Sequence, residues 1–63
     1  TDFVNEFRIN NACKLLHTNM GISDICFESG FNNISHFNKT FKHFKSKSPR
    51  DYRKEVLFVG TLN

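Results

Sequence analysis

The chain has 63 residues, a net charge of +3 and a pI near 9.1, and eight of its residues are phenylalanine. A chain of this length forms one domain and buries only about 60% of the surface that its unfolded form exposes, so large aromatic side chains must supply much of its core. The same length excludes an enclosed ligand pocket of about 300 Å³ or more, and no apolar run reaches the roughly 18 residues of a membrane-spanning helix.

The first predicted element is an amphipathic helix, which occupies residues 1–18 and begins its apolar pattern at Phe3. Its apolar residues recur with the 3.6-residue period of a helix and are expected to face the core. They are Phe3, Phe7, Ile9, Ala12, Cys13, Leu15 and Leu16. Gly21 is expected to help end this segment, since glycine can adopt the positive φ of a turn.

A short second helix is predicted over residues 24–29. Ser23 is a suitable N-cap, and Asp24 lies where a negative charge favours the start of a helix. Gly30 should end it, because the missing Cβ permits a left-handed cap and close approach of the next helix. Two helices joined by a turn of about three residues that contains glycine form a helix-turn-helix, here over residues 22–45.

The third helix is predicted to start at a cap formed by Asn32 or Asn33 and to end near Lys45. One stripe is apolar and should pack in the core; it contains Ile34, Phe37, Phe41 and Phe44. The opposite stripe is polar and basic; it contains Ser35, Asn38, Lys39 and Lys42, with His36 and His43 on its flanks. No acidic residue occurs from Ser29 to Arg50, so positive charge concentrates on this helix and the following loop.

The last predicted helix covers residues 49–57. Ser48 would be its N-cap, Pro49 its first residue and Asp51 the acidic member of a capping box. The tail over residues 58–63 shows no clear period and is expected to be irregular. These segments together predict one all-α domain over residues 1–57, a small helical bundle that contains a helix-turn-helix and is similar to a homeodomain.

The two cysteines, Cys13 and Cys26, fall on apolar stripes and lack the spacing of a zinc site. We expect both to be reduced core residues and expect no bound metal. The chain also lacks a phosphate-cradling glycine loop, a nucleophile elbow and paired carboxylates, so we expect no enzymatic activity and no cofactor. Without a leader or a membrane span, a cytoplasmic location is the default expectation.

Two stretches, FVNEFRINNACKLL and ISDICFESGFNNISHFNKTFKHFKSKSPRDYRK, resemble the C-terminal DNA-binding region of AraC/XylS-type bacterial transcription regulators. The agreement covers nearly the whole chain up to about Lys54. The chain departs from the family at Ser46, where glycine is common, so this turn is expected to differ in backbone conformation. The family has two helix-turn-helix units joined by a long helix, and this chain resembles only that helix and the second unit.

A short internal similarity supports the view that the chain is a fragment of a larger regulator. Thr1-Asp2-Phe3 resembles Arg50-Asp51-Tyr52, as if the chain began just after the Ser-Pro of a preceding unit. The resemblance therefore implies a tandem of which this is the second half. Any oligomerisation is expected to use regions outside this chain.

The predicted partner is double-stranded DNA at a promoter or operator, with the helix over residues 33–45 in the major groove. The residues expected to contact bases are Ser35, His36, Asn38 and Lys39. Those expected to contact phosphates are Asn32, Asn33, Lys42, Lys45, Lys47 and Arg50. The alternative for each is a simpler role: a solvated helix face for the first set, and solubility or helix capping for the second.

A second class of function stays open from the sequence. The same polar helix face could belong to a protein-interaction module that docks on RNA polymerase or on a partner subunit, and the resemblance implies that such contacts accompany DNA binding. A positive ridge centred on Lys39 and Lys42 would favour DNA, whereas an exposed apolar patch would favour protein docking.

Overall fold

The computed structural model describes the backbone of residues 2–62 and the side chains of residues 3–57. This part of the chain forms four helices and no strand: α1 (Asp2–Leu15), α2 (Ile22–Glu28), α3 (Ile34–Lys45) and α4 (Pro49–Leu62). The all-α fold predicted from the sequence is confirmed. The molecule measures 37 × 21 × 17 Å. No helix in the described part is both long enough and apolar enough to span a membrane.

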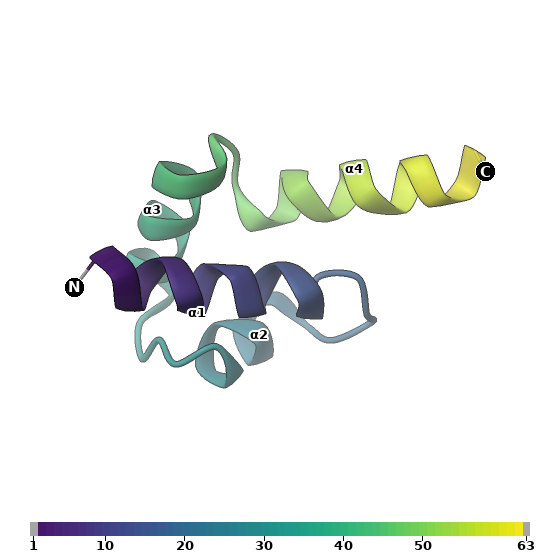
Figure 1. Cartoon of the computed structure of the whole chain (residues 1–63). Coiled ribbons are helices and arrows are strands. Elements are labelled where there is room, and N and C mark those ends of the chain that lie inside the picture. The colour runs from purple at the N-terminus through teal and green to yellow at the C-terminus, as the bar shows by residue number, and fades with distance from the viewer. Residues whose placement is uncertain (1, 63) are drawn as a thin grey trace.

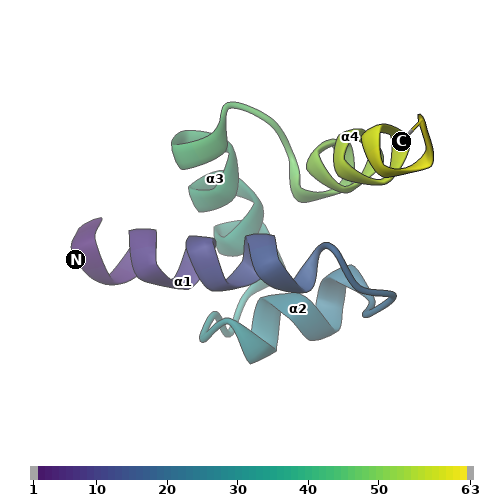
Figure 2. The ribbon, with the colours of Figure 1, turned by 45° about the vertical axis from the view of Figure 1, so that its right-hand side comes forward.

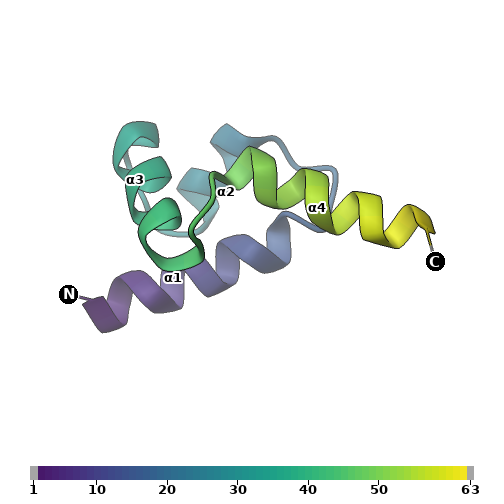
Figure 3. The ribbon, with the colours of Figure 1, turned by 90° about the horizontal axis from the view of Figure 1, so that it is seen from above.

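Helices α2 and α3 form the helix-turn-helix, and α1 packs against both of them (Figures 1 and 2). Helix α4 starts beside the C-terminal end of α3 and then extends away from the other three helices (Figure 3). The outward side of α3 therefore stays free of other helices along its length.

The core is a small apolar cluster crossed by a series of aromatic contacts. Phe31 packs against Phe37, Phe37 against Phe41, and Phe41 against Tyr52, with ring centroids 5.2, 5.9 and 5.5 Å apart. Such tilted and edge-to-face pairs each add about 0.5–1.5 kcal/mol beyond the burial of their area. The rings link the turn before α3 to α4, so the orientation of α3 is fixed along its whole buried side.

Two residues of the predicted core stripe of α1 lie outside the core. Phe3 is 82% exposed and Phe7 is 63% exposed, whereas Ile9 is fully buried. In a helix of about 3.6 residues per turn, Phe7 and Ile9 point to nearly opposite sides, so one packed face cannot include both. The stripe that packs comprises Ile9, Ala12, Cys13 and Leu16. The expectation that Phe3 and Phe7 are core residues is wrong.

The start of α2 also differs from the prediction. Gly21, and not Ser23, is the N-cap, and it makes no side-chain cap hydrogen bond. Its φ of −66° and ψ of 152° are those of extended backbone, so the positive φ expected at Gly21 is not found. Glycine is an acceptable N-cap residue, and the helix starts two residues earlier than predicted, with the apolar Ile22 as its first residue packed against the core.

The turn between α2 and α3 follows the prediction more closely. Gly30 has a φ of +102°, a conformation that favours glycine. Asn33 caps α3, because its Oδ1 accepts a hydrogen bond of 2.9 Å from the backbone N–H of His36. The close approach at Gly30 involves a different neighbour from the one expected: a Cβ there would lie 3.0 Å from Nε of Arg8, on α1.

Helix α4 begins as the sequence predicts and ends later. The Ser48 hydroxyl accepts a 3.1 Å hydrogen bond from the backbone N–H of Asp51, and Pro49 is the first helical residue. The backbone stays helical to Leu62, so an irregular tail from residue 58 is wrong for residues 58–62; residue 63 lies outside the described part. Gly60 is the weakest helix former there, and a single glycine costs about 1 kcal/mol without ending a helix.

Arg53 joins α4 to the end of α1 and the loop that follows. Its guanidinium donates hydrogen bonds to the carbonyl oxygens of Leu16, Thr18 and Met20, at 3.3, 3.1 and 2.5 Å. Carbonyls after the last turn of a helix lack intrahelical donors, and a guanidinium has enough N–H groups to satisfy several of them. This contact positions the first half of α4, and with it the turn after α3.

Cys13 and Cys26 are free and buried, as predicted. Burial raises the pKa of the Cys26 thiol above its ordinary value, opposed by a hydrogen bond with the backbone of Asn33. Burial, together with the neighbouring Cys13, also raises the pKa of Tyr52. Both groups therefore stay protonated at neutral pH and act as core side chains.

Candidate nucleic-acid interface

The outward face of α3 is polar, basic and accessible. Phe37, Thr40 and Phe41 fix the buried side of this helix, so the residues between them point outward. The exposed residues are Ser35, His36, Asn38, Lys39, Lys42 and His43. None of them is acidic, and the positive charge of the face is thus not neutralised from within α3.

Three side chains on this face, those of Asn38, Lys39 and Lys42, make no hydrogen bond or ion pair within the described part of the chain. Their donors and acceptors face solvent. The amide of Asn and the ammonium of Lys are groups that hydrogen-bond to adenine and guanine edges in the major groove. The face therefore has the chemistry to contact bases, and Ser35 is exposed beside these residues on the first turn.

One flank of α3 borders an open groove of about 600 Å³. Ile22 and Ile34 contribute apolar surface, and the polar residues that line it include Ser23 of α2 as well as Lys39 and Lys42 of α3. The N-terminal residues of α4 form the remaining side and include Arg50. The groove is open to solvent, so its volume is not that of an enclosed pocket.

The cations predicted to contact phosphates fall into two groups. Lys42 and Arg50 are exposed at the groove without a partner in the described residues. Lys45 instead donates a 3.4 Å hydrogen bond to Oδ1 of Asn10 on α1, and Lys47 forms an ion pair with Glu55 on α4. The sequence spacing placed all four on one segment, whereas the fold directs only the first two to the groove.

The two asparagines before α3 also differ in their surroundings. The side chain of Asn33 is occupied as the N-cap of the helix. Asn32 is exposed, with no partner among the described residues. His36, which the cap holds through its backbone N–H, packs its ring edge-on against Phe31 at 5.6 Å. Its imidazole therefore has a defined place at the start of α3.

Sequence reasoning missed two residues near this surface. Ser23 was expected only to cap α2, yet it lines the groove opposite α3. Arg8 belongs to α1 and lies outside the acid-free stretch, but its guanidinium carbon is 5.9 Å from the centre of the Phe31 ring. Neither position is predictable from spacing, because both depend on how α1 and α2 pack against α3.

Exposed apolar side chains occur elsewhere on the molecule. The large ones are Phe3, Val4 and Phe7 of α1, Phe27 of α2 and Leu57 of α4. None of them belongs to α3, whose contribution of apolar surface to the groove comes from the partly buried Ile34. In the described residues no group of three His, Cys, Asp or Glu side chains is arranged to hold a metal ion.

Comparison with known proteins gives matches over most of the chain. A family model described as a helix-turn-helix domain matches residues 1–55. Uncharacterized HTH-type transcriptional regulators of Staphylococcus aureus strains COL and MSSA476 are each 40% identical over 52 residues, which are 81% of this chain. The matched part is only 7% of the length of each relative. No solved structure matches the chain significantly.

Proposed function

Because the chain belongs to the AraC-type helix-turn-helix domain family, we propose that it is a DNA-reading unit of a longer transcriptional regulator, with α3 in the major groove of duplex DNA. The family and the relatives support DNA binding in transcription regulation. The observation that carries the placement is the outward face of α3, which is exposed and free of acidic residues, and whose Asn38, Lys39 and Lys42 side chains have no partner in the described part of the chain.

Base reading is assigned first to two exposed residues in the central turns of α3. Asn38 would pair with adenine and Lys39 with guanine, and a good bidentate contact discriminates against a wrong base by about 1–3 kcal/mol. Ser35 and His36, on the first turn, would contact neighbouring bases. The Asn33 cap and the Phe31 ring support this assignment, because they hold the first turn of α3 in place before DNA arrives.

Phosphate contacts would set the position of α3 in the groove without reading sequence. Lys42 and Arg50 are the strongest candidates, since both border the groove beside α3 and neither has a partner among the described residues. Asn32 is also free to contact a phosphate. Smaller contributions are expected from Lys45 and Lys47, which would have to leave Asn10 and Glu55, and from Asn33, whose side chain caps the helix.

The whole regulator would extend this binding mode. We propose that a preceding helix-turn-helix unit, joined through α1, reads an adjacent segment of the major groove, so that the present unit alone binds weakly. A regulator of this kind acts on promoter DNA in the cytoplasm, has no catalytic role and can also contact RNA polymerase. The match covers only 7% of the length of such a relative, which leaves room for further domains in that protein.

Binding is tested by fluorescence anisotropy with a labelled duplex across a series of salt concentrations. The logarithm of the association constant should fall linearly with the logarithm of salt concentration, by about 0.9 for each phosphate contacted. An association constant that does not change with salt would contradict the phosphate contacts. No measurable binding at low salt, for a chain shown to be folded by circular dichroism, would contradict DNA binding by this unit.

The roles of Lys39 and Lys42 are separated with a matched pair of variants. A duplex selected from a random library provides the specific site, and an unselected duplex provides the reference. Lys42→Ala should weaken binding to both duplexes equally, because phosphates are the same in every sequence, whereas Lys39→Ala should weaken binding to the selected duplex by a further 1–3 kcal/mol, roughly. Equal weakening by both variants would remove Lys39 from the base-reading set.

A further inference from the structure

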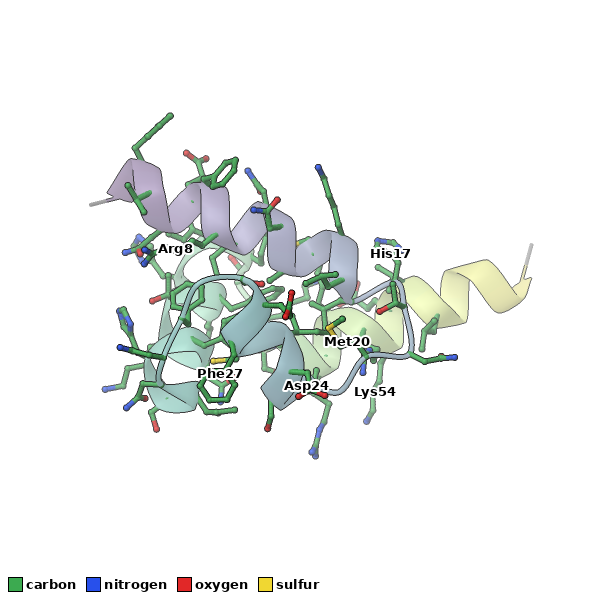
Figure 4. All side chains as sticks on the ribbon, turned by 90° about the horizontal axis from the view of Figure 1, so that it is seen from below. Arg8, His17, Met20, Asp24, Phe27 and Lys54 are labelled. Carbon is green, nitrogen blue, oxygen red and sulfur yellow. The ribbon has the colours of Figure 1, made fainter. Side chains whose placement is uncertain are left out.

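Arg8 is held in a defined position on the side of α1 that faces the helix-turn-helix. It is half-buried, and its guanidinium carbon lies 5.9 Å from the centre of the Phe31 ring. The aliphatic part of the side chain covers Gly30, where a Cβ would come within 3.3 Å of Cδ. Figure 4 shows Arg8 at the end of the molecule where the turn leads into α3. The side chain is thus ordered by packing against the turn.

The N–H donors of this guanidinium have no hydrogen-bond partner among the side chains and backbone groups that the structure describes. No carboxylate or carbonyl oxygen within the described residues accepts a hydrogen bond from Arg8. Arg53 provides the contrast, because its guanidinium donates to three carbonyl oxygens and is thereby committed to the fold. An arginine that is stacked on an aromatic ring and keeps its donors free is suited to a planar bidentate contact with a phosphate.

The place of Arg8 relative to α3 suggests which phosphate it would meet. Arg8 lies over the face of the Phe31 ring, and the centroid of the same ring is 5.6 Å from that of the His36 ring. Arg8 is therefore near the side of α3 that carries His36, the His36 flank. The groove with Lys42 and Arg50 borders the Asn38 flank. His36 and Asn38 are two residues apart in α3, and such residues are separated by about 200° around the helix axis. The His36 flank and the Asn38 flank are therefore on opposite sides of the outward face.

The major groove of B-DNA is about 12 Å wide and is bordered by the phosphate backbones of the two strands. A helix that enters it therefore has one phosphate backbone along each flank. We propose that Arg8 contacts a phosphate of the strand opposite to the one contacted by Lys42 and Arg50. The proposal rests on the proposed function, in which α3 enters the major groove, and adds α1 to the DNA-contacting elements.

The test uses Arg8→Met, which keeps the long side chain over Gly30 and Phe31 and removes the charge and the donors. Lys14→Met is the matched control, since Lys14 is an exposed cation in the last turn of the same helix, away from the turn before α3. Both variants lower the net charge by one. Association constants for an unselected duplex are measured across salt, at a temperature where circular dichroism shows all three proteins to be folded.

Arg8→Met should weaken binding at low salt and reduce the salt slope by about 0.9, so that its deficit relative to the original chain shrinks about 3.5-fold when salt is raised fourfold. Lys14→Met should leave the slope unchanged. Weaker binding by Arg8→Met with an unchanged slope would overturn the proposal, because it would show that Arg8 supports the turn without touching a phosphate. An unchanged affinity would overturn it as well.

A second measurement locates the phosphate. Uncharged methylphosphonates are placed singly along each strand of a selected duplex. At one position, on the strand opposite to the positions that respond to Lys42→Ala, the substitution should weaken binding of the original chain and have no added effect on Arg8→Met. If no position behaves in this way, the proposal fails while DNA binding stands. If the original chain does not bind duplex DNA, the proposed function and this inference both fail.

Discussion

Replacing Ser46 with glycine should stabilise the protein, because Ser46 occupies a backbone conformation that suits glycine. Ser46 ends α3 with a φ of 64° and a ψ of 15°, and it is the one non-glycine residue with positive φ in the described chain. The left-handed conformation costs an L-residue about 1–2 kcal/mol. Glycine removes that cost but adds about 0.4–1 kcal/mol of chain entropy to the unfolded state.

The balance favours the variant by about 0.5–1 kcal/mol, since the exposed Ser46 side chain has no hydrogen bond to lose. For a domain of this size that free energy raises the melting temperature by about 2–8 °C. Thermal unfolding followed by circular dichroism at 222 nm, the usual helix wavelength, measures it. The backbone hydrogen bond from the N–H of residue 46 to the Lys42 carbonyl, 2.8 Å long, should remain.

Two control variants separate the conformational effect from a general effect of removing a serine. Ser46→Ala keeps the φ penalty and should not stabilise the protein. Ser23→Gly puts glycine in the first turn of α2, where the backbone is helical, and should destabilise it by about 0.5 kcal/mol. A melting temperature for Ser46→Gly at or below that of the original chain would refute the reasoning.

Three further predictions concern the other contacts that hold the fold. Arg53→Met should destabilise the protein by about 1.5–3 kcal/mol in urea unfolding, because three carbonyl oxygens lose a charged donor. Arg53→Lys should be destabilised less than Arg53→Met but more than the original chain. If Arg53→Met were as stable as the original chain, the Arg53 contact would not stabilise the fold. Gly30→Ala should destabilise the protein by about 1–3 kcal/mol, because residue 30 has a positive φ and the added Cβ would contact Arg8. Adding Arg8→Ala should relieve the contact and leave the cost of the positive φ. Full recovery of stability in this double variant would show that φ contributes nothing. Because burial raises the folded-state pKa of Cys26 and of Tyr52 above the ordinary values of 9.0 and 10.0, the unfolded chain ionises first. The contribution of these two groups to the free energy of unfolding should be constant below about pH 8 and should fall as the pH passes 9, and a melting temperature that stays level from about pH 8 to pH 10.5 would contradict this.

The features that the sequence predicts well are those controlled by neighbouring residues. Asn33 caps α3 and Ser48 caps α4, because each side chain needs only a backbone N–H three residues later. Gly30 adopts positive φ for a reason that is equally local. The burial of Phe37 and Phe41 follows from a stripe that repeats with the helical period.

The features that the sequence does not predict depend on which helix lies beside which. The helical period places Phe7 and Ile9 on opposite sides of α1, and only the packing of α1 on α2 and α3 decides which of the two sides is covered. The Arg53 contact joins residues 33 to 37 positions apart, and no local pattern signals it. From spacing alone, Lys42 and Lys47 are equally good candidates for phosphate contacts. The fold distinguishes them, because Lys47 forms an ion pair with Glu55 of α4.

The candidate interface therefore depends on contacts far from its own residues. One side of the groove beside α3 is the start of α4, and that start is positioned by the Ser46 turn, the Ser48 cap and the Arg53 contact with the end of α1. The opposite flank of α3 is positioned by the turn at Gly30, against which Arg8 of α1 packs. Helix α1 thus positions both flanks, through Leu16 directly after its C-terminal end and through Arg8 in its middle. A movement of α1 as a rigid body would shift the two proposed sets of phosphate contacts relative to α3, so α1 belongs to the proposed DNA-reading unit together with α2, α3 and the start of α4.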